Sequence, residues 1–276
     1  MAEVTATDIS KLRKLTGAGM MDCKKALEEG AGNVEKAIEI IRKKGQAIAN
    51  KRADRDASEG VALTKVSEDG TKGVLIVLNS ETDFVAKNSD FLTLAYNILD
   101  IALKNLPADL DGLKKLPMEG VTVLDKVVEK LGIIGEKLDL SYYAKIDAPK
   151  VVDYIHPGNK LASLVGFNNA GIDRQIARDV AMQVAAMNPV AIDKADVTAK
   201  MLEQEKDIAR EQARKEGKPE EMIDRIAEGK VNKFYKESTL LNQEFIKDNK
   251  KTVKQYLQSI DKDLTVLGFC RFGLKD

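Results

Sequence analysis

Very few residues of this sequence could carry out covalent chemistry. His156 is the only histidine and lies in a predicted turn, so we expect no histidine-based catalytic triad, and a metal site with several histidines cannot form. Cys23 stands beside Lys24 and Lys25, whose positive charges could lower the pKa of its thiol. It has no evident base partner, and an unpaired cytosolic cysteine usually serves as a packing residue. We therefore predict a protein that is not an enzyme and keep catalysis by the Cys23 thiol as the weakest alternative.

Motifs for cofactors and metals are also missing from the sequence. It contains no GxxxxGK[ST] phosphate loop and no GxGxxG between a strand and a helix, and the segment Gly17–Gly19 is only a GxG that follows a predicted helix. Cys23 and Cys270 lie far apart and form no CxxC pair, which argues against a disulfide framework or a zinc site. We expect no cofactor and no bound metal.

The most unusual segment is the connection that follows the apolar run Val74–Leu78. The run predicts a buried strand, and a helical pattern follows the connection. Between them, residues 79–89 place an acid, a large aromatic and a valine, Asp83–Val85, where a polar loop is expected. The Phe84 ring is therefore either a plug of the local core or an exposed group for recognition.

Composition limits the class of protein. The chain has 276 residues, of which 43% are hydrophobic and 32% are charged, with 44 basic and 44 acidic residues. This length allows two domains, and the balanced charge argues against a strongly basic nucleic-acid binder. No apolar run approaches the ~18 residues that a membrane span needs, and the start of the chain has no secretory signal pattern. We predict a cytoplasmic protein with no membrane contact and no direct contact with nucleic acid.

Residues 1–45 predict three short helices. Thr7 is expected to cap the first helix, and the third should end at Gly45, a favourable residue just beyond a helix. Helices of this size bury little surface, so we interpret the segment as a small recognition module. The alternative is that it merely docks on the main core. Residues 46–60 are polar and mixed in charge and predict a linker.

The middle of the chain predicts a two-part core, residues 61–137 and 138–195, with antiparallel sheets and an α+β fold. Residues 74–102 and 161–187 share one layout, in which an apolar strand, a connection and a helix follow each other. The first connection, 79–89, is longer than the second, 168–172, and a loop lengthened in one copy is a common place for function. The strands are expected at 61–66, 73–78, 138–147, 150–155 and 160–167.

Residues 196–237 contain nearly equal numbers of basic and acidic residues and one break, Gly217–Pro219. Each arm has only a narrow apolar stripe, which favours a protruding antiparallel coiled-coil hairpin. Arms of about 18 residues would extend roughly 27 Å. The alternative is a helix pair that lies flat on the core. Residues 238–276 then return to the core and end in a strand over Leu264–Phe272. The predicted stripe comprises Met201, Ile208, Ala209, Met222, Ile226, Ala227 and Phe234.

Four segments resemble the bacterial elongation factor Ts family. Thr16–Leu27 (TGAGMMDCKKAL) and Glu81–Asn88 (ETDFVAKN) are similar to its two signature segments. Tyr154–Gly158 (YIHPG) is similar to the segment that carries its lone histidine, and Gly268–Phe272 (GFCRF) to its closing strand. Their order and spacing match over essentially the whole chain.

The resemblance implies a fold and a function. The fold has an N-terminal three-helix module like a ubiquitin-associated domain, a two-part α/β core of related halves and a protruding coiled-coil hairpin. The function is guanine-nucleotide exchange on elongation factor Tu, a GTPase. In the family, the segment matching Thr82, Asp83, Phe84 and Val85 acts on the Mg²⁺ site of that partner. We interpret Phe84 as a wedge between partner helices and Asp83 as the polar group that holds it in register.

The resemblance also implies further contacts with elongation factor Tu, at Gly19, Met20 and Met21 in the N-terminal module and at His156 near the phosphate loop of the partner. A second hypothesis remains open, in which the protein is a tethering module for a protein or RNA and releases no nucleotide. The hairpin could also pair with another copy to form a homodimer.

Overall fold

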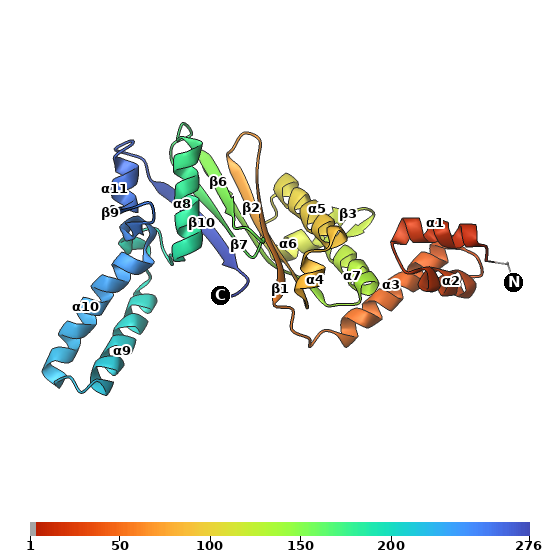
Figure 1. Cartoon of the computed structure of the whole chain (residues 1–276), viewed down its shortest axis with the longest axis horizontal. Helices are drawn as coiled ribbons and strands as arrows, with labels where there is room; N and C mark the ends of the chain where they lie inside the picture. The colour runs from red at the N-terminus through yellow and green to blue at the C-terminus, as the bar shows by residue number, and fades with distance from the viewer. Residues whose placement is uncertain (1–3) are drawn as a thin grey trace.

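The computed structural model describes residues 4–276, which form an elongated molecule of three parts (Figure 1). The N-terminal helices lie at one end, two β-sheets with their covering helices lie in the middle, and a pair of helices projects at the other end (Figure 1). None of the helices in the described part of the chain is long and apolar enough to cross a membrane.

Three helices form the N-terminal part: α1 (Ala6–Thr16), α2 (Met20–Glu29) and α3 (Val34–Lys51). The predicted cap at Thr7 is wrong. Thr5 caps α1 because its hydroxyl accepts the Asp8 N–H while the Asp8 carboxylate accepts the Thr5 N–H, which completes a capping box. Residues 1–3 of the predicted module lie outside the described residues, and its likeness to a ubiquitin-associated domain stays a prediction. Its core comprises Leu12, Ala18, Cys23, Ala26, Leu27 and Ala37.

The third helix does not end at Gly45 but continues to Lys51, so part of the predicted linker is helical. Gly45 is buried where α3 crosses α7 (Val123–Ile134). A Cβ atom on Gly132 of α7 would lie 2.7 Å from the Cα of Gly45, so the two backbones can approach this closely only because both residues lack side chains. The glycine therefore serves helix packing rather than helix termination, and it fixes the N-terminal helices on the core.

Two three-stranded antiparallel sheets form the centre of the molecule. The strand order is β1-β2-β5 in the first sheet and β10-β7-β6 in the second. The antiparallel α+β fold class is thereby confirmed. The strands are β1 (Glu59–Val66), β2 (Lys72–Ser80), β5 (Leu138–Asp147), β6 (Lys150–Ile155), β7 (Leu161–Phe167) and β10 (Val266–Gly273).

One strand joins a different sheet from the one expected. The strand pattern places residues 138–147 in the second half of the core, but β5 pairs along its whole length with β2 of the first sheet. The turn after β5 is short, yet β6 leaves it to begin the second sheet, and a strand pattern alone does not identify the pairing partner. The final strand β10 pairs with β7, as expected. The division of the chain into domains stays a prediction.

Both faces of the first sheet are buried, which explains the unbroken apolar run in β2. Val74, Ile76 and Leu78 face helices α5 (Ser89–Asn105) and α7, whereas Leu75 and Val77 face the second sheet. Successive side chains of a strand point to opposite faces, so a strand between two layers must be apolar throughout. The second sheet packs its other face on α8 (Arg174–Met187), which gives helix, sheet, sheet and helix layers (Figure 1).

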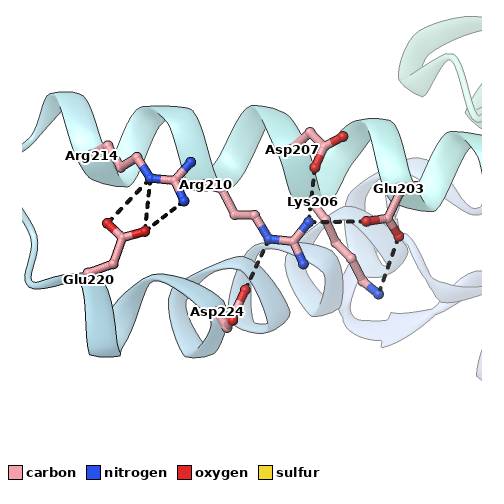
Figure 2. Close-up of polar contacts among 7 residues, drawn as sticks. All are labelled: Glu203, Lys206, Asp207, Arg210, Arg214, Glu220 and Asp224. Atoms are coloured by element: carbon pink, nitrogen blue, oxygen red, sulfur yellow. Dashed lines mark hydrogen bonds and ion pairs between the residues drawn. The ribbon is translucent and has the colours of Figure 1, made fainter.

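The charged region forms two adjacent helices, α9 (Ala199–Lys215) and α10 (Glu220–Ser238), which project from the body (Figure 1). The alternative of a flat pair on the core is therefore wrong, while supercoiling of the pair stays a prediction. Arg210 donates to Glu203 and Asp207 on its own helix and to Asp224 on the other, so charged groups connect the arms (Figure 2). Arg214 and Glu220 form a second link near the turn (Figure 2).

The apolar seam between these two helices differs from the predicted stripe. Ile208 and Met222 are exposed, and the residues that follow them, Ala209 and Ile223, are buried instead. A seam rich in alanine lets the helix axes come close together. Of the predicted residues, Ala209 and Ala227 are buried. The buried set is Ala209, Ala213, Ile223, Ala227 and Val231.

Short elements complete the chain. They are α4 (Asp83–Ala86), α6 (Leu110–Lys115), β3 (Pro117–Met118), β4 (Val121–Thr122), the 3₁₀ turns η1 (Lys194–Asp196) and η2 (Leu240–Asn242), β8 (Glu244–Phe245), β9 (Asp248–Thr252) and α11 (Val253–Gln258).

Candidate functional site

The unusual connection after β2 contains a single helical turn, α4. The strand extends through Ser80 and α5 begins at Ser89, so the connection covers 81–88 rather than 79–89. Phe84 lies on the outer side of the turn, with 83% of its surface exposed, whereas Ala86 is buried and Val85 packs against the core of the first half. The ring is therefore not a core plug, and the inner side of the turn anchors it.

Polar contacts hold both ends of α4. Thr82 precedes the turn, and its N–H and hydroxyl both donate to the Glu136 carboxylate, at 3.1 and 3.0 Å. At the other end, Lys87 donates to Asp83 at 2.6 Å. This hydrogen bond lowers the pKa of the Asp83 carboxyl, so the group is ionised at neutral pH. Asp83 thus presents a negative charge directly beside an exposed aromatic ring.

The turn that contains His156 lies next to α4. A cavity of about 210 Å³ is lined by Asp83, Ala86 and Lys87 on one side and by 158–160 on the other. The Asn159 carbonyl accepts the Ala62 N–H at 2.7 Å, which holds this turn against β1. The structure therefore brings two segments together that lie far apart in the sequence.

His156 itself is exposed and does not line this cavity. Its Nδ1 atom lies 2.9 Å from the Tyr154 hydroxyl, and the guanidinium of Arg178 lies over the Tyr154 ring. The imidazole is thus held by a neighbour on β6, and the residue is accessible from solvent.

The predicted residues of the N-terminal module lie elsewhere. Gly19 precedes α2 in an extended conformation, and Met20 and Met21 follow it with 62% and 64% of their surfaces exposed. In Figure 1 this module lies at the end of the molecule, separated from α4 by α3 and α7. The fold therefore does not join these methionines to Phe84 in one site. Only a partner large enough to span both could contact them together.

Nothing in the described residues supports covalent or metal chemistry at this site. Residues 4–276 contain no group of three or more histidine, cysteine or acidic side chains that could hold a metal ion. Cys23 is fully buried, so its thiol cannot reach a substrate, which removes the argument for it as a nucleophile. Burial raises the pKa of the Cys270 thiol to about 12, so this group stays protonated at neutral pH.

Sequence reasoning missed the residues that support α4. Glu136 comes from the connection between α7 and β5, and Glu81 contacts Arg52, which follows α3. No local pattern marks Glu136. Glu81 opens the signature segment Glu81–Asn88, but the segment does not reveal its partners, because each contact joins positions that are far apart in the chain. Their charges alone do not distinguish them among the many charged residues of the surface.

Comparison with known proteins identifies the family. Residues 81–276 match the family model described as Elongation factor TS. The chain belongs to the elongation factor Ts family. It is 53% identical over 272 residues to elongation factor Ts of Porphyromonas gingivalis, with 98% of each protein covered. The corresponding protein of Amoebophilus asiaticus is 54% identical, with 97% of this chain and 98% of the relative covered. That of Christiangramia forsetii is 49% identical, with 99% and 100% covered.

Membership of the elongation factor Ts family makes this chain an elongation factor of protein biosynthesis. The family match begins at Glu81, the first residue of the connection that carries Phe84, and includes the His156 turn and the hairpin. The full-length relatives also cover the N-terminal helices.

Proposed function

We propose that this protein is a guanine-nucleotide exchange factor for elongation factor Tu that acts without covalent chemistry, in the cytoplasm. The observation that carries the proposal is the exposed Phe84 ring on a turn that is held by Glu136 at its start and by buried Ala86 on its inner side. Exposing a large aromatic ring to water is unfavourable for an isolated protein, and rigid exposed aromatics are the typical anchors of protein interfaces.

An exchange factor need not break a bond in the nucleotide. It must bind the nucleotide-free GTPase more tightly than the nucleotide-bound form, because only a difference in affinity shifts the equilibrium. A GTPase holds its nucleotide through phosphate-loop N–H groups and a bridging Mg²⁺ ion. In our proposal, the ring of Phe84 enters between helices of the partner, Asp83 holds the ring in register, and together they displace the groups that support Mg²⁺. Thr82 and Val85 anchor the turn from which they act.

The His156 turn and the exposed methionines of the N-terminal helices support further contacts with elongation factor Tu. The His156 turn borders the cavity beside α4, so His156 would approach the same domain of the partner near its phosphate loop. Gly19, Met20 and Met21 would form a second contact at a distance, where two adjacent exposed methionines offer flexible apolar side chains. A homodimer through the hairpin stays a separate proposal, which the exchange mechanism does not require.

The test is release of fluorescent GDP from elongation factor Tu in the presence of catalytic amounts of this protein. We expect the wild type to accelerate release. Phe84→Ala should weaken complex formation by about 1–3 kcal/mol, the range for an interface anchor, and should slow GDP release far more. Replacement of Asp83 by Ala should act in the same direction.

Met222→Ala is the matched control, since Met222 is also an exposed apolar residue but lies on the projecting hairpin. Its exchange rate should equal that of the wild type. If the Phe84 variant released GDP as fast as the wild type, the wedge would be rejected. If the wild type bound elongation factor Tu without accelerating release, the tethering hypothesis would replace exchange.

A further inference from the structure

The base of α4 is held by a cluster of charged groups that reaches the end of the N-terminal module. Glu81 immediately precedes Thr82, and its carboxylate accepts the Lys137 N–H at 2.6 Å. The same carboxylate forms ion pairs with Arg52 at 2.6 Å and with Arg55 at 3.3 Å. Glu81 therefore binds two other segments of the chain at once.

A reciprocal set of contacts closes the cluster. The Lys137 ammonium donates to the carbonyls of Ala53 and Arg55, at 2.7 and 2.8 Å. Its neighbour Glu136 accepts both hydrogen bonds from Thr82. Glu81 and Thr82, which precede α4, therefore bind Lys137 and Glu136, which follow α7. Glu81 and Lys137 also contact the segment that follows α3.

Burial distinguishes this cluster from ordinary surface ion pairs. The Glu81 side chain is only 13% exposed, and the three groups that donate to it are a backbone N–H and two guanidinium groups. Charge-assisted hydrogen bonds to a shielded carboxylate are stronger and more directional than exposed pairs. The α3 helix is itself fixed on α7 through the Gly45 and Gly132 contact, so the cluster joins an anchored helix to the turn that carries Phe84.

We propose that Glu81 is a positioning residue that connects the end of α3 to the base of α4, so that the N-terminal module and the Phe84 turn dock on a partner as one rigid unit. The proposal rests on the proposed exchange function and extends it to the residues that position the same site. Glu81 does not touch the partner in this scheme. It acts by holding Thr82, and through Thr82 the direction of the Phe84 ring.

Loosening this cluster should affect catalysis of exchange more than affinity. The module, the ring and the His156 turn would all remain available for binding, but the ring would sample several directions. Small displacements of an acting group lower rates by roughly one to two orders of magnitude. We therefore expect Arg52→Gln and Glu81→Gln each to lower the maximal GDP release rate about tenfold, with little change in the concentration that gives half-maximal release.

Arg42→Gln provides a matched control. Arg42 lies on α3 itself and, like Arg52, pairs with a carboxylate of the core, that of Glu129 on α7, at 2.7 Å. It does not contact the connection that carries Phe84. Its maximal rate should stay within twofold of the wild type. In the double variant of Arg52 and Glu81 the two effects should not add, because both changes break the same contact.

Two results would overturn the proposal. In the first, both Arg52→Gln and Glu81→Gln keep the maximal GDP release rate of the wild type. In the second, Arg42→Gln lowers this rate as much as they do. A second measurement needs no partner. Amide hydrogen exchange at Thr82 and Lys137 should be faster in Arg52→Gln than in the wild type, and unchanged in Arg42→Gln. Equal protection of these amides in the wild type and both variants would also refute the connection. If the wild type failed to release GDP, the exchange function would fail, and this second measurement would still decide whether the cluster holds α4.

Discussion

The connection after β2 and the connection after β7 follow equivalent strands, yet the apolar side chain is exposed in one and buried in the other. In the first, Phe84 is 83% exposed, whereas in the second, Ile172 is only 8% exposed. The second connection is tied to a distant segment, because Asn168 donates to the Asp263 carbonyl at 2.7 Å and Asn169 donates to Asp261 at 2.8 Å. Ile172 belongs to the second core, together with Leu257 and Leu264 on either side of that segment.

The difference shows how one structural unit supports two roles. Both halves place a strand, a connection and a helix in the same order, and both connections are held by polar contacts with distant residues. In the second half these contacts close a core. In the first half they hold the base of α4 and leave its ring in solvent. The apolar residue stabilises the fold in one copy and is available to a partner in the other.

The largest contrast should come from truncating the two apolar side chains. Ile172→Ala should lower the free energy of unfolding by about 2–3 kcal/mol, because it removes buried methyl groups. Phe84→Ala should change that free energy by less than about 0.5 kcal/mol, as expected for an exposed residue. Urea unfolding followed by circular dichroism measures both. Equal losses of stability would mean that the Phe84 ring packs on its own protein in solution, which contradicts the comparison.

Acid should weaken the first connection more than the second. Burial alone would raise the pKa of Glu81, but the hydrogen bonds from the Lys137 N–H and from Arg52 outweigh it, so the pKa lies below its ordinary value of 4.5. A carboxyl with a lowered pKa in the folded state stabilises the protein above its unfolded-state pKa, and this contribution is lost as the pH falls through the folded-state value.

Wild type should therefore exceed Glu81→Gln in thermal unfolding temperature at pH 7, and the gap should narrow as the pH falls below 4.5. Asn168→Ala serves as the control from the second connection, since its amide contacts only the Asp263 carbonyl and the Thr265 N–H, and neither of these backbone groups titrates. The gap between that variant and wild type should keep the same size across this range. A constant gap for the Glu81 variant as well would show that its charge contributes nothing to holding α4.

The smallest effect is expected at Lys87. Its ion pair with Asp83 lies in solvent, where such contacts contribute little to stability. Lys87→Ala should leave the unfolding transition unchanged, and GDP release should slow by less than about threefold, because Asp83 stays charged and α4 stays anchored through Thr82. If Lys87→Ala slowed GDP release as much as Phe84→Ala does, the ion pair rather than the ring would be the group that acts on the partner.

Local patterns predicted most of the secondary structure correctly. The apolar run in β2 and the hairpin turn at Gly217–Pro219 both have the structure that their spacing indicates. Each depends on residues within four positions of one another, where backbone geometry is decisive. Predictions failed where one residue type suits two roles. Gly45 is favourable beyond a helix and equally favourable at a close helix crossing, and only the presence of α7 decides between them.

Residue patterns were enough to predict buried strands, a charged helical hairpin, the scarcity of residues for covalent chemistry and the motifs of the family. The exposure of Phe84, the position of α4 beside the His156 turn and the contact of Glu81 with the end of α3 follow only from the three-dimensional packing. The physical reason is distance along the chain. Periodicity and capping report interactions between near neighbours, whereas the exposure of a side chain depends on which remote segments pack over it.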